Sequence, residues 1–144
     1  TEGKHSVKIK AWDVANNSSE ATIEFVVVKQ VQLQIANVRN FPNPFMVSTT
    51  FAFEHNQPNT DMDVTIHVYS SLGALVKEIR KVVNTVGTRN CQINWNGDNQ
   101  SGAKLTKGIY IYRVIVVAGG SKAETTQQLI LFYKCPNGLI STLF

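Results

Sequence analysis

Apolar and polar side chains alternate along nearly every stretch of this chain, which is the pattern of half-buried β-strands. Residues 62–69 give the clearest example, because every second side chain is apolar: Met62, Val64, Ile66 and Val68. No stretch of about eleven residues or more repeats apolar positions at the spacing of an amphipathic helix. The sequence therefore predicts an all-β protein.

Turn residues divide this alternation into short strands. The predicted strands are residues 7–12, 21–27, 33–37, 49–54, 62–69, 75–83, 90–95, 109–117 and 122–132. The dipeptide Gly119-Gly120 predicts a tight hairpin between the last two. Short strands at regular spacing are typical of an antiparallel β-sandwich.

A proline corner, NFPNPF at residues 40–45, interrupts the alternation. Proline has no backbone donor and restricts the residue before it, so this segment cannot lie inside a central strand. We expect residues 1–30 to be the terminal hairpin of a preceding β-domain, 31–40 a connecting strand or linker, and 41–134 a second sandwich. Residues 135–144 are expected to form a tail of vector or native origin. The absence of an initial methionine suggests a piece of a longer protein.

The composition fits a packed domain and argues against two function classes. Of the 144 residues, 43% are hydrophobic, and no apolar run is long enough to span a membrane. The net charge is +4, but the basic residues are scattered and do not alternate with aromatics as in a nucleic-acid site. We therefore expect neither nucleic-acid binding nor a membrane span.

Few residues have the types and spacing that catalysis or metal binding requires. The histidines His5, His55 and His67 lie on separate strands and loops. The loop at residues 94–102 places oxygen-bearing side chains at alternate positions, as calcium loops do, but it lacks their charge and their late glutamate. A plain strand connection is the favoured alternative. We predict no catalytic residue, no metal and no cofactor.

The two cysteines, Cys91 and Cys135, form no metal or redox motif. Cys91 alternates with Ile93 and Trp95, which predicts a core position for it. Cys135 falls in the C-terminal tail. A disulfide between them and two free thiols both remain open, and neither cysteine is predicted to be a nucleophile.

Four segments together carry a family resemblance. They are "NVRNFPNPFMVSTTFAFEHNQP", "VTIHVYSSLGALVKEI", "INWNGDNQSGAKLTKGIYIYRVIV" and "KAETTQQLILFYK". In this order they resemble the C-terminal sorting domains of the type IX secretion system, and also the Ig-like domain of flagellar hook-capping proteins. Ala74 and Asn96 depart from the family pattern, which usually has a basic residue and an aspartate there. The match covers about residues 38–134.

The resemblance implies a seven-stranded, Ig-like antiparallel sandwich without catalytic activity. It implies a secretion signal and anchor, exported through the periplasm to the outer-membrane surface, that docks to the outer-membrane protein PorV. The positions expected to carry the sorting motif or to bind the partner are Pro42, Asn43, Pro44, Gly73, Gly102, Gly108, Tyr110, Tyr112, Lys122, Leu129, Ile130, Leu131 and Lys134.

The upstream segment "GKHSVKIKAWDVANNSSEATIEFVVV" resembles the region that precedes the sorting domain in the system's own sortase, a gingipain-like cysteine peptidase. By this resemblance the domain would be retained as an anchor on its parent. Separated from its domain, the hairpin at residues 5–28 is expected to pair with a second copy. The alternatives are an adhesive or carbohydrate-binding Ig-like module, with Tyr69, Tyr110 and Tyr112 as its aromatics, and a hook-capping scaffold.

Overall fold

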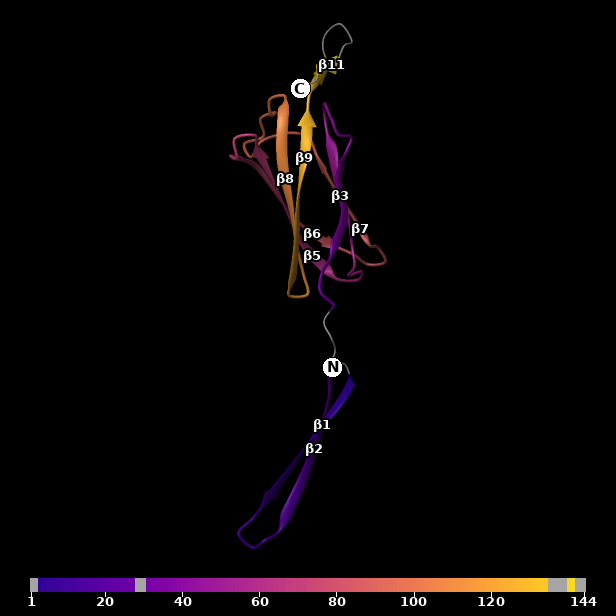
Figure 1. The fold of residues 1–144 in the computed structure, drawn as a ribbon, viewed down its shortest axis with the longest axis vertical. Coiled ribbons are helices and arrows are strands. Elements are labelled where there is room, and N and C mark those ends of the chain that lie inside the picture. The colour runs from indigo at the N-terminus through magenta and orange to yellow at the C-terminus, as the bar shows by residue number, and fades with distance from the viewer. Residues whose placement is uncertain (1–2, 28–30, 135–139, 142–144) are drawn as a thin grey trace. The chain divides into compact units, whose positions relative to one another are not determined.

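The computed structural model describes residues 3–27, 31–134 and 140–141, with side chains described for residues 4–25 and 31–132. The chain forms two units, Thr1–Val31 and Gln32–Phe144, which are described separately below (Figure 1). The described residues contain no helix, and so none that could cross a membrane.

The first unit is a two-stranded antiparallel hairpin of β1 (Gly3–Trp12) and β2 (Ser18–Val27). Its turn is held by the carboxylate of Asp13, whose Oδ1 accepts the backbone N–H groups of Ala15 and Asn17, each at 2.9 Å. The register places Val7 opposite Ile23 and Ile9 opposite Ala21, so one face of the hairpin is apolar. The predicted hairpin is confirmed, and its apolar residues remain about half exposed.

The second unit is a sandwich of a three-stranded and a four-stranded sheet, in the orders β3-β4-β7 and β6-β5-β8-β9. All pairs within the two sheets are antiparallel. The strands are β3 (Ile35–Phe41), β4 (Thr49–His55), β5 (Asp61–Ser70), β6 (Leu75–Asn84), β7 (Asn90–Trp95), β8 (Gly108–Ala118) and β9 (Ser121–Leu131). This arrangement confirms the predicted all-β sandwich, and the Gly119-Gly120 turn joins β8 to β9 as expected.

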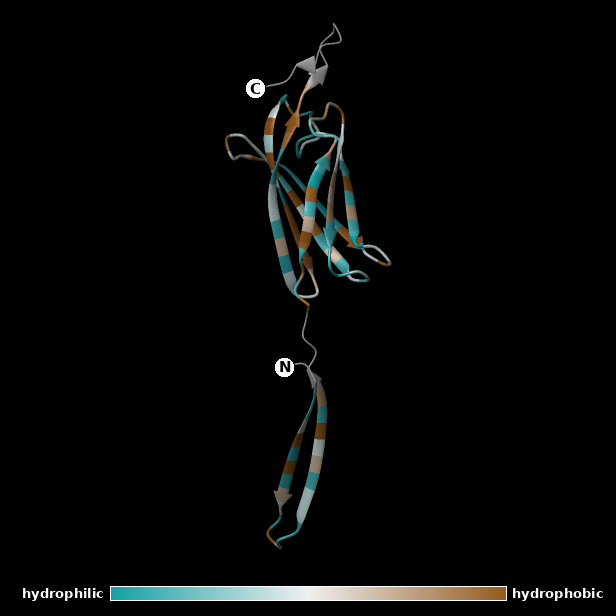
Figure 2. Cartoon of the chain, turned by 45° about the vertical axis from the view of Figure 1, so that its right-hand side comes forward, coloured by the Kyte–Doolittle hydropathy of each residue, from teal (hydrophilic) through white to brown (hydrophobic). Residues whose placement is uncertain are grey.

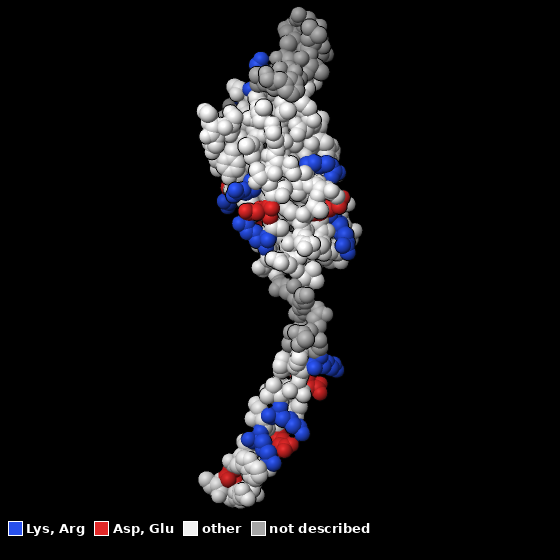
Figure 3. Space-filling model, in the orientation of Figure 1, with Lys and Arg blue, Asp and Glu red and all other residues white. Residues whose placement is uncertain are grey.

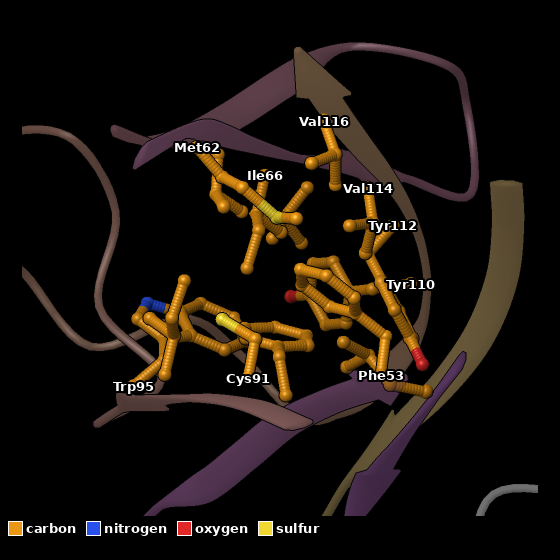
Figure 4. Packing of buried hydrophobic residues seen from close by; sticks show 14 of the residues in the cluster. Phe53, Met62, Ile66, Cys91, Trp95, Tyr110, Tyr112, Val114 and Val116 are labelled. Carbon is orange, nitrogen blue, oxygen red and sulfur yellow. The ribbon is translucent and has the colours of Figure 1, made fainter. Parts of the chain in front are cut away.

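The alternation of the sequence appears in the strands as bands of opposite hydropathy (Figure 2). In β5, the apolar residues from Met62 to Val68 all face inward and are buried. Figure 4 shows Met62, Ile66, Val114 and Val116 of one sheet facing Phe53, Cys91 and Trp95 of the other. Each large apolar side chain removed from water contributes roughly 1.5–3 kcal/mol, so this core is the main stabilising element of the fold.

Aromatic rings join the two sheets at the centre of the core. The ring of Phe51 lies 4.8 Å from that of Tyr112 and 5.8 Å from that of Trp95, measured between centroids. Tyr112 belongs to β8, whereas Phe51 and Trp95 belong to the facing sheet. Rings at these distances interact favourably beyond the area they bury, and they fix how the sheets pack.

The sandwich begins earlier in the chain than expected. Residues 31–40 were expected to connect two domains, but β3 pairs with β4, so the sandwich includes most of this segment. After the sandwich, β10 (Tyr133–Lys134), at the end of the predicted sorting domain, pairs with β11 (Ile140–Ser141) of the predicted tail in a separate two-stranded sheet. The rest of that tail, including Cys135, lies outside the described residues.

Candidate functional site

The last strand of the sandwich, β9, lies at the edge of the four-stranded sheet, next to β8. Leu129 and Leu131 point inward and are buried. Lys122, Glu124, Thr126 and Gln128 are exposed on the opposite face. This strand therefore completes the core with one face and presents the other to solvent.

The proline corner carries the chain from one sheet to the other. Before the corner, β3 is an edge strand of the three-stranded sheet. After it, the Asn43 side chain binds the backbone of β9: its Nδ2 donates to the carbonyl of Gln128 at 3.1 Å, and its Oδ1 accepts the N–H of Ile130 at 3.0 Å. Both proline peptide bonds, Phe41-Pro42 and Asn43-Pro44, are cis. The corner therefore crosses between the sheets rather than opening the domain.

Phe45 anchors this crossing beneath the core. Its backbone N–H donates to the carbonyl of Ile130 and its carbonyl accepts from the N–H of Phe132, which forms a parallel bridge to β9 at Leu131. Its ring is buried, 5.7 Å from the Trp95 ring. A Cβ added to Gly97, whose φ is +72°, would come within 3.1 Å of this ring. Gly97 therefore serves both a left-handed turn and a close approach.

Two buried polar side chains close the base of the corner. The hydroxyl of Thr49 donates to the carbonyl of Pro42 at 2.9 Å and accepts from Nδ2 of Asn40 at 3.1 Å. Asn40 and Thr49 are both buried, and such groups are stable only when they are hydrogen-bonded. The motif residues Pro42, Asn43 and Pro44 are thus held from both sides.

The loop between β7 and β8 uses its oxygen atoms internally. The carboxylate of Asp98 accepts the indole N–H of Trp95 at 3.0 Å and pairs with Nζ of Lys77, also at 3.0 Å. Although burial acts to raise the pKa of Asp98, Lys77 and the Trp95 indole lower it. Oδ1 of Asn99 accepts from the backbone N–H groups of Ser101 and Ala103. The loop is a strand connection held by its own side chains.

The other expected site residues fall into two groups. Gly73 and Gly102 occupy left-handed turns, with φ of +86° and +88°. Gly108 begins β8, and Tyr110 and Tyr112 on that strand are buried, so these two rings belong to the core. Burial raises the pKa of Tyr112 to about 12.

On β9, Lys122 is exposed and pairs with Glu124 at 3.1 Å. Ile130 is half-buried on the outer face. The side chain of Lys134 lies outside the described residues. Of the residues expected to bind a partner, the structure brings the proline corner to Leu129, Ile130 and Leu131, and leaves Lys122 at the far end of the strand.

An exposed aliphatic face was not predicted. The outward side chains of β8 are aliphatic except for Arg113, and three of them expose 38–42% of their surface: Ile109, Ile111 and Val117. Ile115 lies between them and is half-buried. We call these four residues the aliphatic face. The sequence signal was present, because both alternating sets of β8 are apolar, but alternation alone does not reveal that one set stays uncovered.

A groove between the edge strands β3 and β9 was also missed. Its volume is about 700 Å³, and its lining includes Leu33, Ile35, His55, Ala123 and Thr125. His55, expected in a polar loop, ends β4 and is only 5% exposed. Its spacing from Phe51 and Phe53 was the available signal.

The ring nitrogens of His55 are buried and have no hydrogen-bond partner of standard geometry among the described residues. Burial is the main cause that lowers the pKa of His55, and nearby Arg89 adds to it, while the Gln57 backbone acts in the opposite direction. The imidazole is therefore neutral near neutral pH.

Within the described ranges, no three His, Cys, Asp or Glu side chains gather as a metal site would require. Burial also raises the pKa of the Cys91 thiol to about 11, which makes it a poor nucleophile. On the face drawn in Figure 3, basic and acidic residues are interspersed. The described surface thus presents an edge strand, an aliphatic face and a groove.

Comparisons with known proteins agree with this geometry. A family model described as "Secretion system C-terminal sorting domain" matches residues 39–131. The chain is similar to dimeric latent PorU from Porphyromonas gingivalis, with 28% identity and a TM-score of 0.63 over 91% of this chain and 12% of that one. PorZ of the same organism's type IX secretion system matches with 19% identity and a TM-score of 0.42, over 66% of this chain and 11% of that one.

No curated protein sequence matches the chain. The PorU match covers 91% of the chain, so it extends beyond residues 39–131 of the family match. The family match spans the proline corner, the loop after β7 and the β8–β9 hairpin, which are the elements that the structure binds together. The chain belongs to the family of type IX secretion system C-terminal sorting domains and resembles the C-terminal part of PorU.

Proposed function

We propose that this domain holds its parent protein at the outer-membrane surface after export by docking to an outer-membrane protein of the PorV type. Membership of the sorting-domain family implies a role in type IX secretion and export to the cell surface. The domain itself acts without catalysis, as a signal and an anchor.

The observation that carries the docking proposal is the aliphatic face beside the C-terminal strand. Exposed apolar patches rimmed by polar residues are typical of protein interaction sites. Here Lys122 and Glu124 of β9 border the aliphatic residues of β8, since Val117 pairs with Lys122 and Ile115 with Glu124. A partner that docks on this surface would bury the apolar area of β8 and contact the charged side chains of β9 at the same time.

We further propose that the parent is a sortase cysteine peptidase of the PorU type, with its catalytic domain outside this sequence. The match to PorU covers 91% of the chain at 28% identity, which supports this parent. The chain spans 12% of the length of PorU. We therefore propose the peptidase activity for the parent protein and not for this chain. On such a parent the domain is retained rather than removed.

The test is to place a charge in the aliphatic face and measure docking and folding separately. Ile111→Glu should leave the melting temperature within a few degrees, because this side chain is 42% exposed. It should reduce co-purification of the PorV-type partner about tenfold or more, since a charge would be desolvated in the interface. Gln92→Glu, an exposed position on the outer face of the other sheet, is the matched control.

A second variant tests the lysines of the signal strand. Lys122→Glu combined with Lys134→Glu should fold normally and show weaker surface retention and weaker partner binding. If both this variant and Ile111→Glu export and co-purify like the unaltered protein, the docking surface is wrongly assigned. If only the lysine variant does so, the aliphatic face alone carries the contact.

The carbohydrate-binding alternative depended on a row of exposed aromatic rings. Tyr110 and Tyr112 are buried and Tyr69 is half-buried, with its hydroxyl 3.3 Å from Nδ1 of His67. These three tyrosines therefore offer no stacking platform for a sugar, and nothing else in the described residues favours that function.

A further inference from the structure

The outer edge of β9 is hydrogen-bonded along only part of its length. Toward its C-terminal end, the carbonyl of Gln128 and both backbone groups of Ile130 bind the proline corner. Hydrogen-bonding direction alternates along a strand, so Lys122, Glu124 and Thr126 point their backbone groups the same way. Among the described residues these groups have no partner.

Both ends of this open stretch are closed by other parts of the same domain. At the start of β9, the Oγ of Ser121 accepts the N–H of Leu33 at 2.9 Å. At the far end, the side chain of Asn43 is hydrogen-bonded to the backbone of Gln128 and Ile130. Residues 122–126 are therefore an unpaired window of about 14 Å at roughly 3.4 Å per residue, enough for a strand of about five residues.

The groove lies next to this window. Ile35 and Ala123 form part of its lining and are half-buried against the core, so side chains entering it would meet an apolar floor. His55 also lines the groove and is only 5% exposed, and its buried ring nitrogens lack a hydrogen-bond partner of standard geometry among the described residues. The site thus combines an unpaired strand edge, an apolar floor and an unsatisfied buried polar group.

We propose that the window at residues 122–126 binds a short extended peptide segment of another protein as an added strand of the four-stranded sheet. Alternating backbone donors and acceptors at strand spacing are complementary to an extended peptide backbone. The backbone of Phe45 already binds the same edge in this way at Leu131, five residues beyond the window. The segment has small or β-branched uncharged side chains at every second position, because those positions face Ile35 and Ala123.

An exposed edge with charged side chains can also be a simple protection against aggregation. Lys122 and Glu124 fit that reading, because they pair with each other on the solvent face. Protection alone would leave the window empty at any peptide concentration, whereas the proposed site takes up a peptide. The two readings therefore differ in a measurable way.

The experiment follows the backbone amides of the complete chain by NMR and hydrogen exchange. The probe is the acetylated and amidated pentapeptide Thr-Val-Thr-Val-Thr, titrated to millimolar concentration. We expect shift changes confined to the window and to Ile35, and exchange of the Glu124 and Thr126 amides slowed about tenfold or more. The same peptide with every amide N-methylated should cause neither change.

A matched pair of variants tests the role of the backbone itself. Glu124→Pro removes one outward N–H at an edge position where proline is tolerated, and should weaken peptide binding at least tenfold. Glu124→Ala keeps that N–H and should bind like the unaltered chain. The N-methylated peptide gives the same information if Glu124→Pro does not fold.

Three outcomes would overturn the proposal: no response in the window, equal responses to the plain and the methylated peptide, or protection that appears with rising protein concentration alone. The last would identify a second copy of the chain as the occupant. Ile111→Glu changes the aliphatic face and leaves the window intact, so it should still bind the pentapeptide. Failure of peptide binding is therefore distinguishable from failure of the docking proposal.

Discussion

The β1–β2 and β8–β9 hairpins have strands of nearly equal length, 10 residues in the first and 11 in the second. In both hairpins, one alternating set of positions carries apolar side chains. In the first, Ile23 and Phe25 expose 54% and 44% of their surface, whereas Leu129 of the second is completely buried. Alternation therefore specifies the strand, and the facing sheet decides whether its apolar side chains stabilise the fold.

The comparison also shows how each hairpin relates to its surroundings. The second is paired on one side by β5 and held along part of its outer edge by the proline corner. The first has no third strand among the described residues. A two-stranded hairpin is marginally stable alone. The β1–β2 hairpin therefore needs another element packed on its apolar face, and the described residues of this unit supply none.

The largest expected difference comes from matched pairs of alanine substitutions in the two hairpins. Leu129→Ala with Leu131→Ala should remove up to about 2–5 kcal/mol for each leucine, which approaches the whole stability of a small domain. Ile23→Ala with Phe25→Ala should shift the sandwich melting transition little. Thermal unfolding followed by circular dichroism measures both, and equal effects would contradict the comparison.

A second pair of substitutions compares the two phenylalanines of the proline corner, one buried next to β9 and one largely exposed. Phe45→Ala should destabilise the sandwich by about 3–5 kcal/mol, because it empties the space beneath Trp95 and loosens the bridge to β9. Phe41→Ala, at the other end of the corner, should cost far less, since Phe41 is 41% exposed and Phe45 only 1%. Denaturant unfolding gives both values. Similar costs would mean that the corner is held by its backbone alone.

The third test compares how pH changes the stability when the buried His55 or the less buried His5 is replaced. Since the folded state lowers the pKa of His55 below 6.5, the unfolded chain binds more protons as pH falls, and stability present above about pH 6.5 is lost below it. The melting temperature should drop between about pH 7.5 and about pH 5.5. His55→Gln should flatten this drop, whereas His5→Gln on the first hairpin should retain it.

The carboxylates with lowered pKa values do not titrate in the pH range of the His55 effect. The pKa values of Glu78 and Glu124 are lowered from 4.5 by hydrogen bonds from His67 and Lys122 respectively, and that of Asp98 is lowered from 3.8. Their contributions to stability are therefore lost only at lower pH. A drop that persists in His55→Gln would show that another group is responsible.

The smallest effect on stability is expected from removing the first hairpin. A chain starting at Val31 should melt like the complete chain, because the sandwich contains its own core. Self-association should be lost, since the hairpin exposes apolar side chains and unpaired strand edges that recruit a second copy. Light scattering compares the two masses, and two monomers would refute a pairing role for residues 5–28.

The strands and the core were predictable, and the contacts between edges were not. The period-two pattern predicted β7 at residues 90–95 and the inward face of β5 because each position reports on its own burial. The crossing at Asn43 depends on a strand 85 residues away, to which no local pattern refers. The aliphatic face was missed for the related reason that both faces of β8 read as core.

The bridge between Phe45 and β9 also has a consequence for the order of events during export. It joins the first part of the sandwich to its last strand, across 87 residues between Asn43 and Ile130. Contacts of such long separation form late, after the loop between them has closed. If the chain emerges N-terminus first, the sandwich therefore cannot complete its fold until β9 is available. Completion of the fold would then report that every strand of the sandwich has been delivered.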